Sequence, residues 1–149
     1  MTIIVDSDRY KIYWHDDEHT ILVGEVYVGW TWTDAYEGLK TFNETLGIRS
    51  NEVKVYAILD FHGGAQLLPK PGSILANLRN LLNTDPQYEE MTVYVIQMGF
   101  LFSMMQIASK LYGIRHWIDK HRFVITMEEA LQIIEQEKSK SKSLNTLLQ

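Results

Sequence analysis

The residues best suited to chemistry in this sequence follow an apolar run near the middle of the chain. The run ends in "LDF" at residues 59–61, and the loop that comes next opens with His62, Gly63 and Gly64. Paired glycines after a strand let backbone N–H groups face a developing oxyanion, and Ser73 would be the nucleophile of such a site. That chemistry requires a Gly-x-Ser-x-Gly turn, and the chain contains none. The sequence therefore favours a turn and a helix start over a catalytic loop, and we expect no enzymatic activity.

A second group with ligand chemistry is the run "HDDEH" at residues 15–19, which brings imidazole and carboxylate groups close together. A metal site needs such groups to converge at helical spacing or to meet a further ligand from elsewhere in the chain. This run lies between two β-rich segments, where the side chains of a turn diverge. We therefore interpret it as a polar turn and predict neither a metal site nor a bound cofactor.

Aromatic and sulfur-containing side chains gather in two regions that would suit an apolar molecule. Trp30 and Trp32 follow the second β-rich segment, and the helix-like segment 100–112, apolar on almost every side, contains Phe102 and Met105. Such residues pack in protein cores, and they also line ligand clefts and protein interfaces. Both interpretations stay open, with sheet packing favoured for the tryptophans and an interface favoured for the helix.

Composition excludes several classes of function. The 149 residues carry a formal net charge of −5 without a basic stripe, so the chain is not expected to bind nucleic acid. The absence of cysteine removes thiolate metal sites and cysteine nucleophiles. The opening "MTIIVDSDRYK" lacks the basic and long apolar regions of a signal peptide, which predicts a cytoplasmic protein.

One uncharged run, residues 91–109, approaches the length of a membrane span. It contains several Thr, Gln, Gly and Ser residues, and its β-rich first half gives way at Gly99 to a helix-like second half. This pattern is typical of a buried strand followed by a buried helix, so we predict no membrane span.

Periodicity predicts the first elements that position these groups. Residues 9–14 and 19–28 are rich in β-branched and aromatic types, which indicates an antiparallel hairpin. Alternation in the second segment places Leu22 and Val28 on one face, which we expect to be the core side. Apolar residues at helical spacing then predict a helix over 34–48.

Cap residues and apolar runs complete the predicted fold. Thr31 or Thr33 suits the start of the first helix, and Gly47 suits its end. Strands and helices then alternate over residues 53–61, 73–83, 91–98, 100–112, 121–125 and 127–137. The fold class is therefore α/β, a single-layer mixed, mostly parallel sheet with helices in the order ββαβαβαβα. We expect one domain over residues 1–137 and a flexible Lys/Ser-rich tail over 138–149.

Two stretches carry a resemblance to a known family. "VYAILDF" at 55–61 leads through a loop to a helix that begins near a serine, and "HRFVITMEEALQII" at 121–134 joins a strand to a helix. With the order of elements, these stretches resemble the central strand and the final strand and helix of the STAS superfamily, which includes anti-sigma-factor antagonists. The resemblance covers roughly residues 21–134 and implies a STAS-like fold, with CRAL-TRIO lipid carriers as looser relatives.

The resemblance also implies site residues. The phosphoacceptor serine of the antagonists matches Ser73, although their Asp-Ser-Ser-Gly motif is replaced here by "KPGS". A phosphate on Ser73 would lie at a helix N-terminus, where free N–H groups favour an anion. The implied switch loop and partner surface comprise the segment 62–82 and the residues Asp60, His62, Gly63, Gly64 and Lys70.

From this resemblance we expect a non-enzymatic regulatory domain that binds another protein or a second copy of itself. The alternative, which the CRAL-TRIO kinship implies, is a carrier of a small apolar ligand or lipid. Its cleft would be lined by Trp30, Trp32, Phe102 and Met105.

Overall fold

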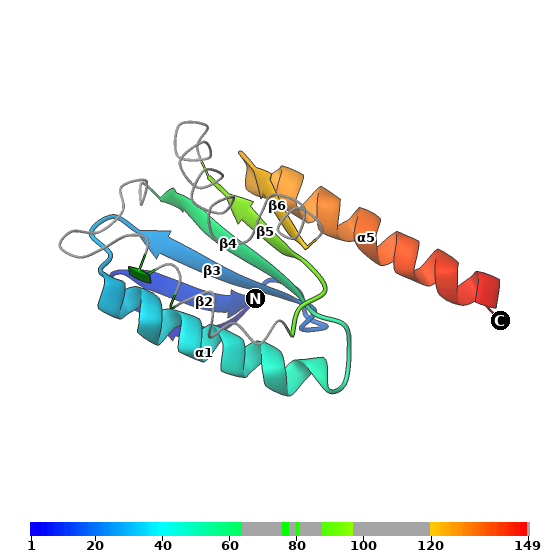
Figure 1. Cartoon of the computed structure of the whole chain (residues 1–149), viewed down its shortest axis with the longest axis horizontal. Helices are drawn as coiled ribbons and strands as arrows, with labels where there is room; N and C mark the ends of the chain where they lie inside the picture. The colour runs from blue at the N-terminus through cyan, green and yellow to red at the C-terminus, as the bar shows by residue number, and fades with distance from the viewer. Residues whose placement is uncertain (64–75, 78–79, 81–87, 97–119, 149) are drawn as a thin grey trace.

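The computed structural model describes residues 1–63, 76, 77, 80, 88–96 and 120–148, which form one six-stranded sheet with a helix on each face (Figure 1). The described elements are β1 (Thr2–Asp6), β2 (Tyr10–Trp14), β3 (Ile21–Tyr27), α1 (Trp32–Ser50), β4 (Tyr56–Gly63), β5 (Thr92–Val95), β6 (His121–Val124) and α5 (Met127–Leu148). The helices predicted over 73–83 and 100–112 lie outside the described residues, except that Ala76, Asn77 and Asn80 are helical.

The strands lie side by side in the order in which they occur in the chain. The pairs β1–β2 and β2–β3 are antiparallel, whereas β3–β4, β4–β5 and β5–β6 are parallel. Parallel neighbours require a crossover connection that passes over one face of the sheet, and α1 is that connection between β3 and β4. The predicted α/β class with a mixed, mostly parallel sheet is confirmed.

Strand β1 is an addition to the predicted order, which began with two strands rather than three. Its register against β2 shifts between Ile3 and Val5, and the side chains of Ile3 and Ile4 are 47% and 40% exposed. A bulge of this kind bends an edge strand and makes it a poorer template for further pairing. Residues 2–6 do not alternate between apolar and polar types, so their sequence did not predict a strand.

Both faces of the sheet are buried over its centre. The cluster on the α1 face contains Ile12, Trp14, Leu22, Phe42, Leu46, Val55 and Ala57. The cluster on the α5 face contains Tyr13, Ile21, Val23, Tyr56, Ile58, Met91, Val93, Val95, Val124, Ala130 and Ile134. The expected core side of β3 was therefore only half correct. Val23 is as fully buried as Leu22, because β3 lies inside the sheet and is covered from both sides. Val28 is exposed, because it lies beyond the end of the strand.

Helix α1 is capped by Thr31, one of the two predicted caps, and ends later than predicted. The Thr31 hydroxyl accepts from the backbone N–H of Asp34, and the Asp34 carboxylate accepts from the backbone N–H of Thr31, which makes a capping box. Gly47, the predicted end, lies inside the helix, which continues to Ser50. A Cβ atom at position 47 would lie 2.7 Å from a ring carbon of Tyr88, so this glycine permits close packing instead of ending the helix.

Helix α5 includes most of the segment predicted as a tail. It continues to Leu148, and it packs against β4, β5 and β6 before running on past the sheet (Figure 1). Two contacts join its second half to the rest of the domain: Lys138 Nζ donates to Thr20 Oγ1 at 2.8 Å, and Lys54 Nζ donates to Ser141 Oγ at 2.5 Å. The segment is helical, whereas its flexibility and the domain boundary at residue 137 stay predictions.

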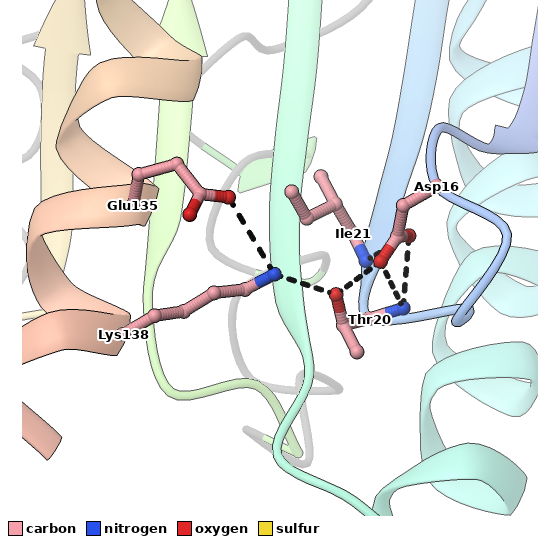
Figure 2. A network of polar contacts seen from close by, with 5 residues as sticks. All are labelled: Asp16, Thr20, Ile21, Glu135 and Lys138. Carbon is pink, nitrogen blue, oxygen red and sulfur yellow. Dashed lines mark hydrogen bonds and ion pairs between the residues drawn. The ribbon is translucent and has the colours of Figure 1, made fainter. Parts of the chain in front are cut away.

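The turn between β2 and β3 is organised by one carboxylate (Figure 2). Asp16 accepts from the backbone N–H groups of Thr20 and Ile21 at 2.9 and 3.0 Å, and it also accepts from the Thr20 hydroxyl. Lys138, which lies 3.8 Å from the Glu135 carboxylate, extends this network to α5. Burial by itself raises the pKa of Asp16, but the hydrogen bonds from Thr20 and Ile21 outweigh it and hold the pKa below its ordinary value of 3.8.

The uncharged run 91–109 is described only at its start, where Thr92–Val95 forms the buried strand β5. Within the described part of the chain, no helix combines the length and the apolar character that crossing a membrane would require.

The substitution Asp16→Asn is expected to lower the free energy of unfolding by about 1–3 kcal/mol at pH 7, because a charged acceptor of several hydrogen bonds is lost. Since folding lowers the pKa of Asp16, its stabilising contribution is complete above pH 3.8 and disappears as the pH falls through the folded-state pKa. Urea titrations at pH 7 and pH 3 would measure the difference, which should shrink at the lower pH. Asp17→Asn, at an exposed neighbour in the same turn, is the matched control, and equal losses for both variants would contradict the assignment.

Candidate functional site

The candidate site lies at the carboxyl ends of the parallel strands β3 and β4. The two strands pair with Glu25 beside Asp60 and Tyr27 beside Gly63, so both end at the same edge of the sheet. Ligands of open α/β sheets bind outside this edge, because the loops that leave it surround a common space. The alternation of side chains gives this edge two different surfaces, one polar and one aromatic.

The polar surface is centred on Glu25. The Tyr13 hydroxyl donates to one oxygen of its carboxylate at 2.9 Å, and the Tyr27 hydroxyl donates to the other oxygen at 2.8 Å. Lys11 Nζ lies 5.3 Å from the centre of the Tyr13 ring, within the range of a cation–π contact. The two phenols thus hold the carboxylate in one orientation on the same face as Asp60.

The protonation of the phenols follows from these contacts. Burial, the hydrogen bond to Glu25 and the charge of Glu25 together raise the pKa of Tyr27 to about 12. Burial and the same carboxylate also raise the pKa of Tyr13, and the charge of Asp60 adds to both shifts. Both phenols are therefore neutral donors at physiological pH, and neither is a general base there.

The aromatic surface consists of Trp30, Trp32 and Phe61. The rings of Trp30 and Trp32 lie edge to face, with centres 5.5 Å apart and an angle of 77° between their planes. Phe61 of β4 adds a third ring, whose centre is 6.4 Å from that of Trp30. Phe61 and Asp60 are successive residues of one strand and point to opposite faces, which separates the aromatic surface from the carboxylates.

Local backbone chemistry fixes the two tryptophans. Gly29 has a φ of +87°, which only glycine adopts without strain, and its carbonyl accepts a hydrogen bond from the Arg9 guanidinium. Thr31 then caps α1, so that Trp32 is the first helical residue. The sequence "GWTW" thus combines a turn, a cap and two rings within four residues, and this brings the two rings into edge-to-face contact.

Both indole N–H groups lack an acceptor. Among the described residues, Trp30 Nε1 and Trp32 Nε1 are the buried side-chain donors without a hydrogen-bond partner, and the Trp32 side chain is only 9% exposed. A buried donor that is left unpaired costs about 1–3 kcal/mol. The buried Tyr94, in contrast, is paired: its hydroxyl contacts His121 Nδ1 at 2.9 Å.

The structure brings together some of the predicted site residues. Trp30 and Trp32 are in contact, Asp60 lies on the opposite face beside Glu25, and His62 and Gly63 are the last residues of β4. The remaining predicted residues, Gly64, Lys70, Ser73, Phe102 and Met105, lie outside the described residues. In the described ranges, no group of three His, Asp or Glu side chains is arranged to hold a metal ion, and the "HDDEH" run forms the turn of Figure 2.

Sequence reasoning missed Glu25 with its two tyrosines. The available signal was the alternation that puts Glu25 and Tyr27 on one face of β3, but that face was taken to be solvent-facing. Tyr13 could be added only by knowing the hairpin register, in which Tyr13 faces Val23, two residues before Glu25. That register depends on the Asp16 turn, which the pattern of residue types does not specify.

No protein-family model, curated protein or solved structure matches this chain. The geometry of the site is therefore the basis of the functional argument.

The substitution Glu25→Gln is expected to lower the pKa of Tyr27 from about 12 towards 10.0, because the negative acceptor of its proton is removed. An absorbance titration near 295 nm should then show more tyrosinate at about pH 11 than in the wild type. Tyr27→Phe identifies the contribution of that residue, and Glu44→Gln, at an exposed position on α1, is the control for charge. Superimposable titration curves of the wild type and Glu25→Gln would show that the carboxylate does not hold the phenols.

Proposed function

We propose that this protein is a non-enzymatic, STAS-like binding domain of the cytoplasm that acts on another protein through the loop and helix at residues 62–82. The observation that carries the proposal is the place where β4, the strand before this segment, ends. Strand β4 lies between β3 and β5 and ends at Gly63, at the carboxyl edge. Loops at this edge of a rigid parallel sheet are the usual place for binding residues.

The arrangement of the described strands supports the STAS-like part of the proposal. From β3 to β6, consecutive strands pair in parallel in their order along the chain, and the helix α5 follows the last of them. The two stretches that carry the resemblance, 55–61 and 121–134, supply β4 and the junction of β6 with α5. A regular sheet of this kind is a rigid support from which one loop and one helix can present a surface.

Ser73 is the proposed regulatory position. Phosphorylation there would add about two negative charges to the partner surface of a protein that is already acidic overall. Charge added within a protein interface lowers affinity when it is buried without a counter-charge. The domain would thus bind its partner protein while Ser73 is unphosphorylated and release it once Ser73 is phosphorylated.

Affinity purification with Ser73→Asp and Ser73→Ala tests this function. A partner retained by the wild type and by Ser73→Ala should be retained about tenfold less by Ser73→Asp, which corresponds to ~1.4 kcal/mol. Ser143→Asp introduces the same charge at an exposed position of α5 and should leave retention unchanged. Sedimentation of the purified variants would reveal a second copy as the partner. Equal retention by all variants, or a wild type that captures nothing and stays monomeric, would refute the proposal.

Binding of a small apolar ligand is a second candidate function, and one observation favours it. The aromatic surface holds two buried indole donors without acceptors at the edge where ligands of α/β sheets bind. A molecule bound against these rings would bury apolar area and supply the hydrogen-bond acceptors that the two indole N–H groups lack.

Native mass spectrometry of freshly purified protein should then show a second species, heavier than the bare chain by the mass of a small molecule, that disappears under denaturing conditions. Replacement of both rings, Trp30→Ala with Trp32→Ala, should abolish this species. A single native peak at the mass of the bare chain, unchanged by the double substitution, would contradict this second function.

A further inference from the structure

The unpaired indole N–H groups of Trp30 and Trp32 indicate which chemical group a ligand would need. An indole N–H donates one hydrogen bond and accepts none, so only an acceptor atom can satisfy it. Two such groups, from Trp30 and Trp32, are buried at one place in the fold, and the two rings are in contact. A shared deficit of acceptors between neighbouring side chains calls for an explanation, and a ligand that bears an acceptor would supply one.

The rings themselves favour a flat apolar body. The Trp30 ring centre lies 5.5 Å from that of Trp32, at 77°, and 6.4 Å from that of Phe61, at 56°. Because Trp32 is only 9% exposed, a ligand must enter between these rings instead of resting on an open surface. Rings at such angles contact a planar molecule with both faces and edges, and each contact of this kind adds to the area that it buries.

The charges around the rings argue against an anion. The Asp34 carboxylate already lies at the start of α1, where it accepts from the Thr31 backbone N–H at 2.9 Å and from the Thr31 hydroxyl at 3.0 Å. The positive end of this helix is thereby compensated. The Arg9 guanidinium, the basic group that contacts this segment, donates to the Gly29 carbonyl. A neutral acceptor meets the two indoles without repulsion from Asp34.

We propose that Trp30, Trp32 and Phe61 form a binding site for a neutral, planar, apolar molecule whose carbonyl oxygen accepts a hydrogen bond from the indole N–H groups. This inference rests on the second candidate function and adds the chemical class of the ligand. The rings supply the binding area, and the indole donors supply the preference for a carbonyl.

Three probes of matched size separate these contributions. Acetylnaphthalene has a flat ring system and a neutral carbonyl, isopropenylnaphthalene has a methylene group in place of the carbonyl oxygen, and naphthoate carries an anionic acceptor. Each is titrated into protein labelled with nitrogen-15 on its four tryptophans, whose indole N–H signals report directly on the donors. Trp30→Phe and Trp32→Phe assign their signals and remove one donor each while keeping an aromatic ring.

Acetylnaphthalene is expected to shift the signals of Trp30 and Trp32 in a saturable manner and to bind about three- to tenfold more tightly than isopropenylnaphthalene, the effect of one hydrogen bond. In the doubly substituted protein, Trp30→Phe with Trp32→Phe, this preference should vanish. Trp14, stacked on His19 with ring centres 5.2 Å apart and part of the core under α1, is the control signal and should not move.

Each other outcome overturns the inference in a distinct way. Equal binding of acetylnaphthalene and isopropenylnaphthalene would leave the small-ligand function standing and remove the role of the carbonyl. Tighter binding of naphthoate would make the site one for anions. The absence of any saturable shift, or an equal shift of Trp14, would remove the inferred site, while the protein-binding function at residues 62–82 would be judged by its own experiment.

Discussion

The parallel pairing of β3 with β4 is the constraint on which the rest of this structure depends. β3 is antiparallel to β2 and parallel to β4, so it joins the hairpin half of the sheet to the crossover half. Its residues Leu22 and Val23 are fully buried on opposite faces, one under α1 and one under α5. The same register places Glu25 beside Asp60 and brings both strands to an end at one edge, where the candidate site lies.

The opposite end of β3 is held by polar contacts that join distant parts of the chain. Asp16 closes the turn before β3, and Lys138 of α5 donates to Thr20 within that turn (Figure 2). Arg49, near the end of α1, donates to the backbone carbonyls of Glu18 and His19 from the other side. Helices on both faces therefore converge on one turn, which fixes the hairpin and, through its register, places Tyr13 within reach of Glu25.

The two surfaces of the carboxyl edge differ in how completely their polar groups are satisfied. On the polar side, both oxygens of Glu25 accept a hydrogen bond from a phenol, so this carboxylate has donors without a ligand. On the aromatic side, two indole donors are buried without acceptors. Since unpaired buried donors are costly, the aromatic side is where a bound molecule would gain most, and β4 ends at the same edge with Gly63.

What the sequence by itself determined was local: the hairpin strands, predicted at 9–14 and 19–28 and found at Tyr10–Trp14 and Ile21–Tyr27, and a helix cap at Thr31 or Thr33, because these depend on residue types a few positions apart. The alternation of strands with helices also predicted a mixed, mostly parallel sheet, because parallel neighbours need a crossover connection between them. Strand β1 and the helical extent of 138–148 were missed, since their conformation depends on pairing with β2 and on packing against the sheet. The residue type of Gly47 predicted a helix end, whereas in the structure this glycine lies inside α1 and packs closely against Tyr88. The Glu25 cluster and the unpaired indoles were likewise decided only by the tertiary structure, because register and burial arise between segments that are distant in the chain.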